Sequence, residues 1–322
     1  MKEAIKLIRE LQNIRKVPQF IFIHHVYPDT TAKVRSELMS FKKNHPEIDE
    51  VDVVLNSPGG SADDAYRIIR TLRKGFKIVN IVVPFWAKSA ATLLALGGST
   101  IIMDEFGEFG PLDTQLRGDK DEEFPDPEPK SALIDEYTLK TIENRASRLY
   151  MSMMKEVIDN KEVRIKKTSL SEHLLSYIPA FYRPLLEKID PYEIGSKARA
   201  LEVGAKYAER ILVEFNSDNI DSKKDLDRFV DYLVHGCPDH GYIIDYSLIS
   251  QFLKNIKEAK DIGKEYCETL TEISSRFFKV AVEGNYVGFC PAEDEETNSK
   301  PNLEIDGVNS ANINRGGGGN EK

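Results

Sequence analysis

The sequence predicts an α/β fold in which strand–helix units build a parallel sheet, followed by a largely helical C-terminal half. Two observations carry this prediction. Short runs of β-branched and aromatic residues alternate with amphipathic helical patterns over residues 19–103, and from about residue 131 the helical spacing continues without clear strand signals. Alternation of this kind favours parallel strands, because each helix returns the chain to the edge where the previous strand began.

Four strands and three helices are expected in the first part of the chain. Each strand is a short run bounded by polar or turn residues, and each helix spaces its apolar residues by three or four positions. The strands are expected at Gln19–His25, Glu50–Leu55, Lys77–Val83 and Thr100–Met103, and the helices at Thr31–Asn44, Ser61–Arg73 and Ser89–Leu96.

The second part of the chain is expected to be helical between two polar segments. Helical spacing recurs over 131–160 and 191–215, and Tyr242–Ile244 suggests one short strand. Residues 117–130 are rich in acids and proline, which is typical of an exposed loop or lid. The tail over 293–322 is acidic, rich in Asn and then in Gly, and is expected to be disordered.

These patterns divide the chain into four parts. An amphipathic helix is expected over 1–18, and the main domain over 19–254, with its helical half starting near residue 131. A C-terminal helical extension follows over 255–292, and the disordered tail occupies 293–322. No internal repeat is apparent, so the two halves of the main domain are expected to differ in structure.

Composition narrows the function classes. A net charge of −9 leaves no broad basic surface for phosphates, so no nucleic-acid partner is expected. Three cysteines without a CxxC pair favour free thiols in a reducing compartment. The first helix interleaves charges with its apolar residues, unlike a signal peptide, and the apolar stretch 78–103 is broken by Pro84, Lys88 and two glycines. We expect a cytoplasmic protein without a membrane span.

The segment Asn56–Gly60 (NSPGG) lies between an expected strand and an expected helix. Backbone N–H groups are unpaired at a helix start, and glycines let the chain adopt positive φ and let a substrate carbonyl approach closely. An oxyanion hole requires these properties, although Pro-Gly-Gly is also ordinary turn chemistry. Gly59 and Gly60 are therefore candidate oxyanion-hole residues.

Ser89 follows the next expected strand and opens a helix of small residues. At a helix N-terminus its hydroxyl would lie near the positive end of the helix dipole, which favours a developing alkoxide. Capping a helix is a commoner use of serine than catalysis, so this turn alone favours a capping role. Parallel strands place their carboxyl ends side by side, however, so Ser89 is expected to face Gly59 and Gly60. The N–H groups of Gly60 and Ala90 could then meet at one carbonyl oxygen.

Three motifs carry a family resemblance. LNSPGGSADDA at 55–65, AKSAATLLALGG at 87–98 and Gly110–Asp113 resemble the Clp-fold serine peptidases, and most of all the serine dehydrogenase proteinase (SDH) family. The resemblance is strong over 21–115, with a weaker stretch over 233–244. It implies a Clp/crotonase-like fold of stacked βαβ units and a serine peptidase that acts through an acyl-enzyme on Ser89.

The general base is less defined than the nucleophile. The histidine that Clp peptidases carry soon after the serine is missing from GEFGPLDTQL, whereas the SDH family order of serine, aspartate and histidine implies Ser89, Asp113 and His240. An imidazole suits a base at neutral pH, and an aspartate can orient it. A lysine is the alternative base, with Lys88 and Lys130 as candidates.

Two histidine-containing segments have other interpretations. His235, Cys237, Asp239 and His240 include zinc-ligand types, but four ligands from one hexapeptide would be crowded, so neither metal nor cofactor is expected. His24 and His25 end the first expected strand, and both are expected to be structural.

A peptidase acting on peptides or proteins is the main functional hypothesis. A crotonase-like acyl-CoA enzyme shares the fold and the paired-amide oxyanion hole but usually lacks a serine nucleophile. A non-catalytic binding module is the third hypothesis. It is considered because this fold tends to assemble into homo-oligomers and because the amphipathic first helix offers an apolar face for docking. Nothing in the chain resembles a P-loop, so any ATPase partner would be a separate chain.

Overall fold

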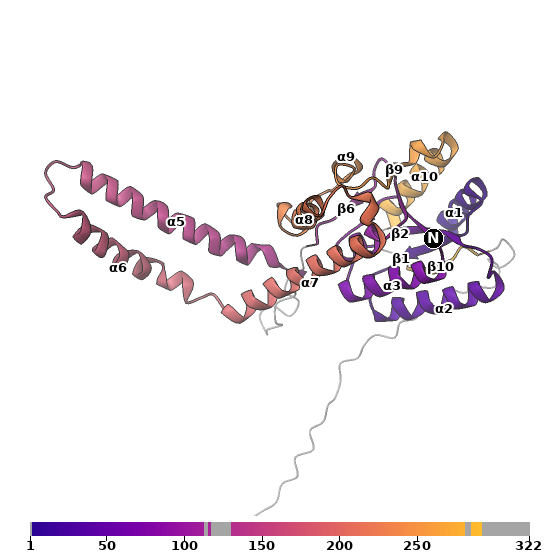
Figure 1. The fold of residues 1–322 in the computed structure, drawn as a ribbon, viewed down its shortest axis with the longest axis horizontal. Helices are drawn as coiled ribbons and strands as arrows, with labels where there is room; N and C mark the ends of the chain where they lie inside the picture. Colours follow the sequence, from indigo (N-terminus) through magenta and orange to yellow (C-terminus); the bar gives the residue numbers. More distant parts are fainter. Residues whose placement is uncertain (1, 113–114, 117–129, 281–284, 292–322) are drawn as a thin grey trace, which may run out of the picture. The chain divides into compact units, whose positions relative to one another are not determined.

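The structure is a computed structural model that describes residues 2–112, 115–116, 130–280 and 285–291 (Figure 1). Residues Met1–Cys290 form one compact unit. The unit is a mixed α/β structure around a mainly parallel sheet, so the predicted fold class is confirmed. Within the described residues, no helix is both long enough and apolar enough to cross a membrane.

The central sheet has six strands in the order β10-β1-β2-β3-β5-β9. All neighbours pair in parallel except β10, which is antiparallel to β1. Four of the strands match those expected from the sequence. The bounds are β1 Gln19–Ile23, β2 Glu50–Asn56, β3 Ile78–Val83, β5 Thr100–Met103, β9 Ile256–Glu258 and β10 Tyr286–Phe289.

Helices cover both faces of the sheet, which explains why its strands are apolar along almost their whole length. On one face, Ile21 and Val54 pack with α1 Lys2–Arg15 and α10 Lys264–Val280. On the other face, the alternate residues Phe22 and Leu55 belong to a core to which several helices contribute. These helices include α2 Pro28–Asn44, α3 Ala62–Gly75, α4 Ala90–Leu96 and α7 Pro191–Phe215.

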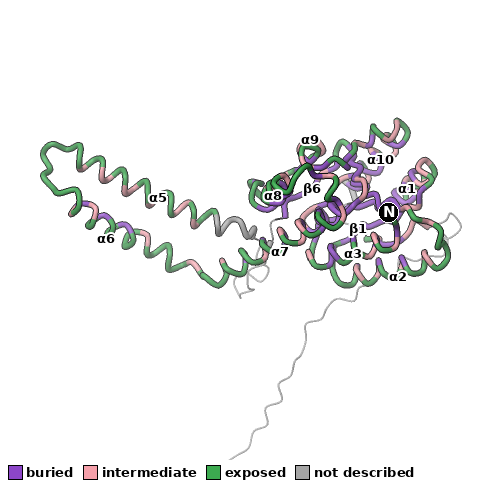
Figure 2. The backbone as a smooth tube through the Cα atoms, viewed as in Figure 1, coloured by how far each residue is buried: buried purple, intermediate pink, exposed green. Residues whose placement is uncertain are grey.

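The second half is mainly helical, as the sequence predicts. The helix α5 Ala132–Asp159 packs against α6 Lys167–Leu186 and against α7. The sequence patterns did not identify α6, which contains two prolines and buries only one narrow row of residues, at Leu170, Leu174 and Ile178 (Figure 2). Further helices are α8 Lys223–Asp231, α9 Tyr246–Ile249 and three short turns, η1 Ser217–Asn219, η2 Tyr232–Gly236 and η3 Ala259–Asp261.

The C-terminal segment differs from the expected helical extension. It contains α10, but it also supplies β9 and β10, which form the two edges of the sheet. Both strands are too short to give a clear period of two, and β10 is fixed by tertiary packing, with the Phe289 ring stacked on Phe41 at 3.8 Å between ring centroids. The expected tail over 293–322 and the acidic stretch over 117–129 lie outside the described residues.

Short strands complete the region that follows β3. They are β4 Trp86–Ala87, β6 Glu108–Phe109, β7 Gln115–Leu116 and β8 Lys130–Ser131. The β4 strand pairs with β6 in parallel. Of the strand expected at Tyr242–Ile244, the structure contains only a single bridge between Ile244 and Phe109.

Candidate active site

The turn after β2 brings two glycines to the carboxyl edge of the sheet. Gly59 and Gly60 have φ of +98° and +146°, which L side chains rarely adopt. A Cβ on Gly60 would stand 2.2 Å from the Val26 carbonyl oxygen, so that position has no room for a side chain. Ser61 ends the turn as the N-cap of α3, and its side chain accepts a hydrogen bond from the Asp64 N–H.

A backbone bridge to Val26 leaves the Gly60 amide free. The Val26 N–H donates to the Gly59 carbonyl at 2.8 Å, and the Ser61 N–H donates to the Val26 carbonyl at 2.8 Å. In a parallel bridge with this pattern, the N–H of the middle residue, Gly60, points away from the paired strand. Among the described residues it has no acceptor. The Gly59 N–H donates to Ser57 Oγ at 3.1 Å, so it is not available to a substrate. Gly59 matters for the site because it lacks a side chain and adopts a positive φ.

The turn after β3 holds Ser89 in an unusual backbone conformation. Ser89 has φ +51° and ψ −119°, and Lys16 is the one other non-glycine residue with positive φ in the described part of the chain. Such conformations cost about 1–3 kcal/mol and persist only where surrounding structure enforces them. Ser89 stands at the N-cap position of α4 but makes no capping hydrogen bond through its side chain, so the capping interpretation of this serine is wrong.

Hydrogen bonds from three segments enforce this turn. The Lys88 N–H donates to the Ser57 carbonyl at 2.9 Å, and the Gly110 N–H donates to the Ala87 carbonyl at 3.2 Å. The buried Thr92 hydroxyl lies 2.8 Å from the carbonyl oxygens of both Ala87 and Gly110. The β3–α4 turn is therefore fixed between the NSPGG turn on one side and the chain after β6 on the other.

The two turns meet as the parallel sheet requires. A Cβ built on Gly59 would stand 2.9 Å from Ser89 Cβ and 3.0 Å from the Ala90 nitrogen. The Ala90 N–H has no acceptor among the described residues, because it starts α4. Gly60, Ser89 and Ala90 line one pocket of about 640 Å³.

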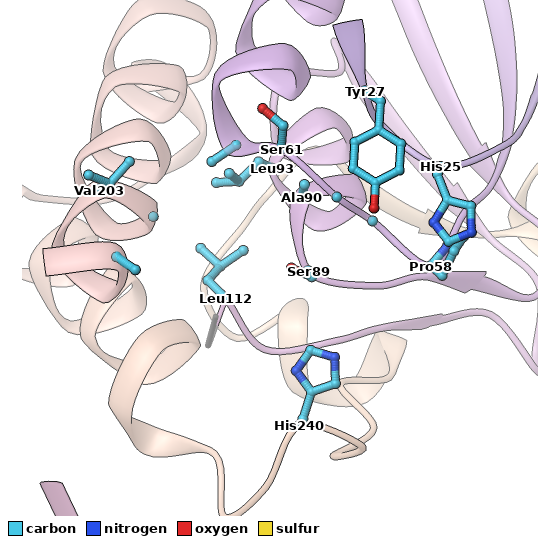
Figure 3. A pocket seen from close by; sticks show the side chains of 15 residues that line it. His25, Tyr27, Pro58, Ser61, Ser89, Ala90, Leu93, Leu112, Val203 and His240 are labelled. Carbon is cyan, nitrogen blue, oxygen red and sulfur yellow. The ribbon is translucent and has the colours of Figure 1, made fainter. Parts of the chain in front are cut away.

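His240 lines the same pocket (Figure 3). Its loop is tied to the chain that follows β6: Phe109 and Ile244 exchange two backbone hydrogen bonds of 2.9 and 3.1 Å, and the Leu112 N–H donates to the Leu233 carbonyl at 2.8 Å. Figure 3 shows the half-buried imidazole extending from the loop toward Ser89 and Leu112. The structure thus brings the sequence-predicted nucleophile and histidine to one cavity, although they lie far apart in the sequence.

The other predicted site residues are placed differently. Lys88 Nζ pairs with Glu108 Oε1 at 2.7 Å, with only 12% of its side chain exposed, and it also donates to the Phe109 carbonyl at 3.4 Å. Lys88 is absent from the described residues that line the pocket, and its ammonium contacts Glu108 and Phe109 of β6 instead. Asp113 and the side chain of Lys130 lie outside the described part of the structure.

His25 is a pocket residue that the sequence interpretation missed. His24 is buried, and its Nδ1 lies 3.1 Å from the His25 carbonyl oxygen, which fits the structural role expected for it. His25 instead lines the pocket, with its ring stacked on that of Tyr27. Burial, and then the neighbouring His24, lower the pKa of His25. The available signal was its place one residue beyond His24 at the carboxyl end of β1, because alternate residues face opposite sides.

The histidine and cysteine residues of the 235–240 segment are dispersed. His235 is exposed and pairs with Asp231 at 3.2 Å, whereas the buried Cys237 thiol donates to the Tyr232 carbonyl at 3.5 Å. Across the described ranges, no three side chains of His, Cys, Asp or Glu are grouped so as to hold a metal ion. In the described part of the chain, Cys237, Cys267 and Cys290 form no disulfide.

Comparison with known proteins supports the family resemblance of the two turns. Residues 6–163 match the sequence model of the ClpP-like SDH-type serine proteinases. The resemblance to the SDH family is confirmed. The match includes both turns and Ser89, and it ends before the segment that carries His240.

Curated relatives and solved structures add little about function. Two uncharacterised proteins of Methanocaldococcus jannaschii are 31% and 26% identical over 122 and 124 residues. Each match covers 35% of this chain and only 43% or 42% of the relative. Among solved structures, a 1510-N membrane-bound stomatin-specific protease mutant is 18% identical and covers 48% of this chain and 66% of that chain. A ClpP1 mutant from Listeria monocytogenes is 14% identical, and the match covers 52% of this chain and 82% of that chain. The TM-score is 0.28 for each of these two structures.

Proposed function

We propose that the protein is a serine peptidase in which Ser89 is the nucleophile, the amides of Gly60 and Ala90 form the oxyanion hole, and His240 is the general base. The family match supports a serine peptidase of the SDH type. The observation that carries the detailed proposal is the joint placement in one pocket of a serine with an enforced positive φ, two amides without acceptors, and an imidazole.

The proposed reaction follows from these positions. His240 takes the Ser89 proton as Oγ attacks the peptide carbonyl carbon, and the carbonyl oxygen gains negative charge facing the Gly60 and Ala90 N–H groups. Collapse of this tetrahedral intermediate breaks the C–N bond, and the imidazolium returns the proton to the leaving amine. Water activated by the same imidazole then hydrolyses the acyl ester and restores the Ser89 hydroxyl.

The environment of Lys88 argues against Lys88 as the base, whereas the side chain of Lys130 lies outside the described part of the structure. Removing a proton from an ammonium that is paired with a carboxylate at 2.7 Å would leave Glu108 with an uncompensated charge in a largely buried position. Lys88 instead connects the Ser89 turn to β6, through an ion pair with Glu108 and a hydrogen bond to the Phe109 carbonyl.

Peptide hydrolysis by matched variants tests these assignments. Ser89→Ala and His240→Ala are each expected to lower kcat/KM by about 10³-fold or more, because nucleophile and base act as one unit. Lys88→Met is expected to lower the free energy of unfolding, and to lower kcat/KM much less than Ser89→Ala and His240→Ala do. Full activity in His240→Ala together with loss in Lys88→Met would reverse the assignment of the base. Turnover that survives Ser89→Ala would rule out Ser89 as the nucleophile, and binding of acyl-CoA thioesters would then favour the crotonase-like alternative.

A further inference from the structure

The pocket beside Ser89 has two unlike walls. One side of Ser89 is lined by Leu93 of α4, by Val203 of α7 and by Leu112, which follows β6. The other side is lined by His25 and Tyr27 (Figure 3). Ala200 and Gly204 extend the first side along α7. We call Leu93, Leu112, Ala200 and Val203 the aliphatic wall, and His25 and Tyr27 the aromatic wall.

The described residues that line this pocket include no Asp, Glu, Lys or Arg, although such residues make up 30% of the chain. A charged substrate side chain would therefore lose water contacts here without gaining an ion partner, which costs binding free energy. The lowered pKa of His25 also disfavours a positive charge on the aromatic wall. The pocket suits uncharged side chains on both sides of the bond that is cut.

The aromatic wall is held in place by its backbone. The bridge between Val26 and Gly60 fixes the middle of the segment, and the buried Thr30 hydroxyl accepts a hydrogen bond from the Tyr27 N–H at 3.0 Å. Because His25 and Tyr27 are two positions apart in extended backbone, their side chains share a face. Their rings stack with 5.6 Å between centroids and an interplanar angle of 14°. A fixed stack loses little further entropy on binding a ligand.

The aromatic wall also adjoins the proposed oxyanion hole. A Cβ on Gly60 would stand 3.2 Å from Tyr27 Cε1, so the ring edge lies beside the Gly60 backbone. A substrate carbonyl held by the Gly60 amide therefore has one flanking residue directed toward Tyr27 and His25. Leu93 and Val203 lie on the opposite side of Ser89 (Figure 3).

We propose that His25 and Tyr27 are specificity-determining residues that select an aromatic side chain on one flank of the scissile bond, while the aliphatic wall accepts a small or aliphatic side chain on the other. This inference rests on the proposed peptidase function. An aromatic ring suits the first wall because ring pairs gain free energy from offset or edge contacts in addition to the area that they bury. The proposed substrates are peptides whose cleaved bond joins an aromatic residue to an aliphatic one.

A set of synthetic peptides tests this selection. The peptides share one sequence and carry Phe, Ala or Glu at each of the two positions that flank the cleaved bond. For the wild type, kcat/KM is expected to be at least about 10-fold higher with Phe than with Ala on one flank, and lowest with Glu. His25→Ala and Tyr27→Ala are each expected to reduce the Phe-to-Ala ratio several-fold, and His25→Phe is expected to retain it.

Matched controls separate specificity from general damage. His173 on α6 and Tyr192 on α7 are exposed and lie outside the pocket, so His173→Ala and Tyr192→Ala are expected to keep the wild-type ratio. Val203→Phe narrows the aliphatic wall and is expected to change preference on the opposite flank only. A Phe-to-Ala ratio that is near one in the wild type, or that stays unchanged in both His25→Ala and Tyr27→Ala, would overturn this inference.

The outcome for Ser89 distinguishes failure of this inference from failure of the proposed function. If no peptide is cleaved and no Ser89-directed reagent reacts, the proposed function fails and the inference fails with it. If cleavage depends on Ser89 but ignores the aromatic wall, only the inference fails.

Discussion

Gly59 lies directly against Ser89: a Cβ on Gly59 would stand 2.9 Å from Ser89 Cβ and 2.5 Å from the Lys88 carbonyl oxygen. The closeness of these two residues joins the NSPGG turn to the turn that carries the proposed nucleophile. It also explains why a glycine at position 59 matters even though its own N–H is bonded to Ser57.

Gly59→Ala is therefore expected to lower the free energy of unfolding by about 1–3 kcal/mol and to abolish peptide cleavage, because the methyl group displaces Ser89 and the backbone is strained at φ +98°. Urea unfolding measures the first effect. Gly195→Ala is the matched control: no atom lies within 4 Å of the added Cβ in α7, so about 0.5–1 kcal/mol of added stability is expected. Equal effects of the two substitutions would contradict this account of Gly59.

The backbone conformation of Ser89 predicts that two inactive variants, Ser89→Gly and Ser89→Ala, differ in stability. Glycine tolerates φ +51° better than serine or alanine, so Ser89→Gly is expected to be more stable than Ser89→Ala by about 1 kcal/mol, while both lose peptidase activity. Urea or thermal unfolding of the two purified variants measures the difference. If Ser89→Gly is the less stable variant, the conformation at Ser89 is not strained.

The strands and both turns could be predicted from the sequence because their signals are local. The runs 19–23 and 51–55 are almost continuously apolar, as expected for strands that are covered on both faces, and each candidate turn directly follows such a run. For His25, alternation indicates only that its side chain faces the opposite side from His24. That this side adjoins the pocket depends on the backbone bridge between Val26 and Gly60. Val203 was missed because α7 reaches the pocket only through tertiary packing.

Asn216 connects the end of α7 with the end of α4. Its buried amide nitrogen donates to the carbonyls of Leu96 at 2.6 Å and Gly98 at 3.0 Å. Asn216→Ala leaves the Leu96 carbonyl without this donor and is expected to cost about 1–3 kcal/mol of unfolding free energy. Thermal unfolding checks this, with the exposed neighbour Asp218→Ala expected to stay within about 0.5 kcal/mol of the wild type. A similar change in both variants would show that the Asn216 contacts do not stabilise the fold.

His25 predicts part of the pH dependence of stability. Its pKa is lowered in the folded protein from the ordinary value of 6.5, mainly by burial, so as the pH falls through 6.5 the unfolded chain takes up a proton at His25 before the folded protein does. The free energy of unfolding therefore declines between pH 6.5 and the lower folded pKa. His25→Phe should show a weaker decline in this window when urea unfolding is followed at several pH values. The same slope in both proteins would contradict the lowered pKa.

The site of reaction with a fluorophosphonate probe tests the central claim most directly. In such probes the oxygen of an activated serine displaces fluoride from phosphorus and forms a phosphonate ester, and tandem mass spectrometry of the digested protein identifies the modified residue. The account predicts one adduct, on Ser89, at a rate that falls strongly in His240→Ala and is abolished in Ser89→Ala. An adduct on another serine, or undiminished labelling of Ser89→Ala, would contradict it.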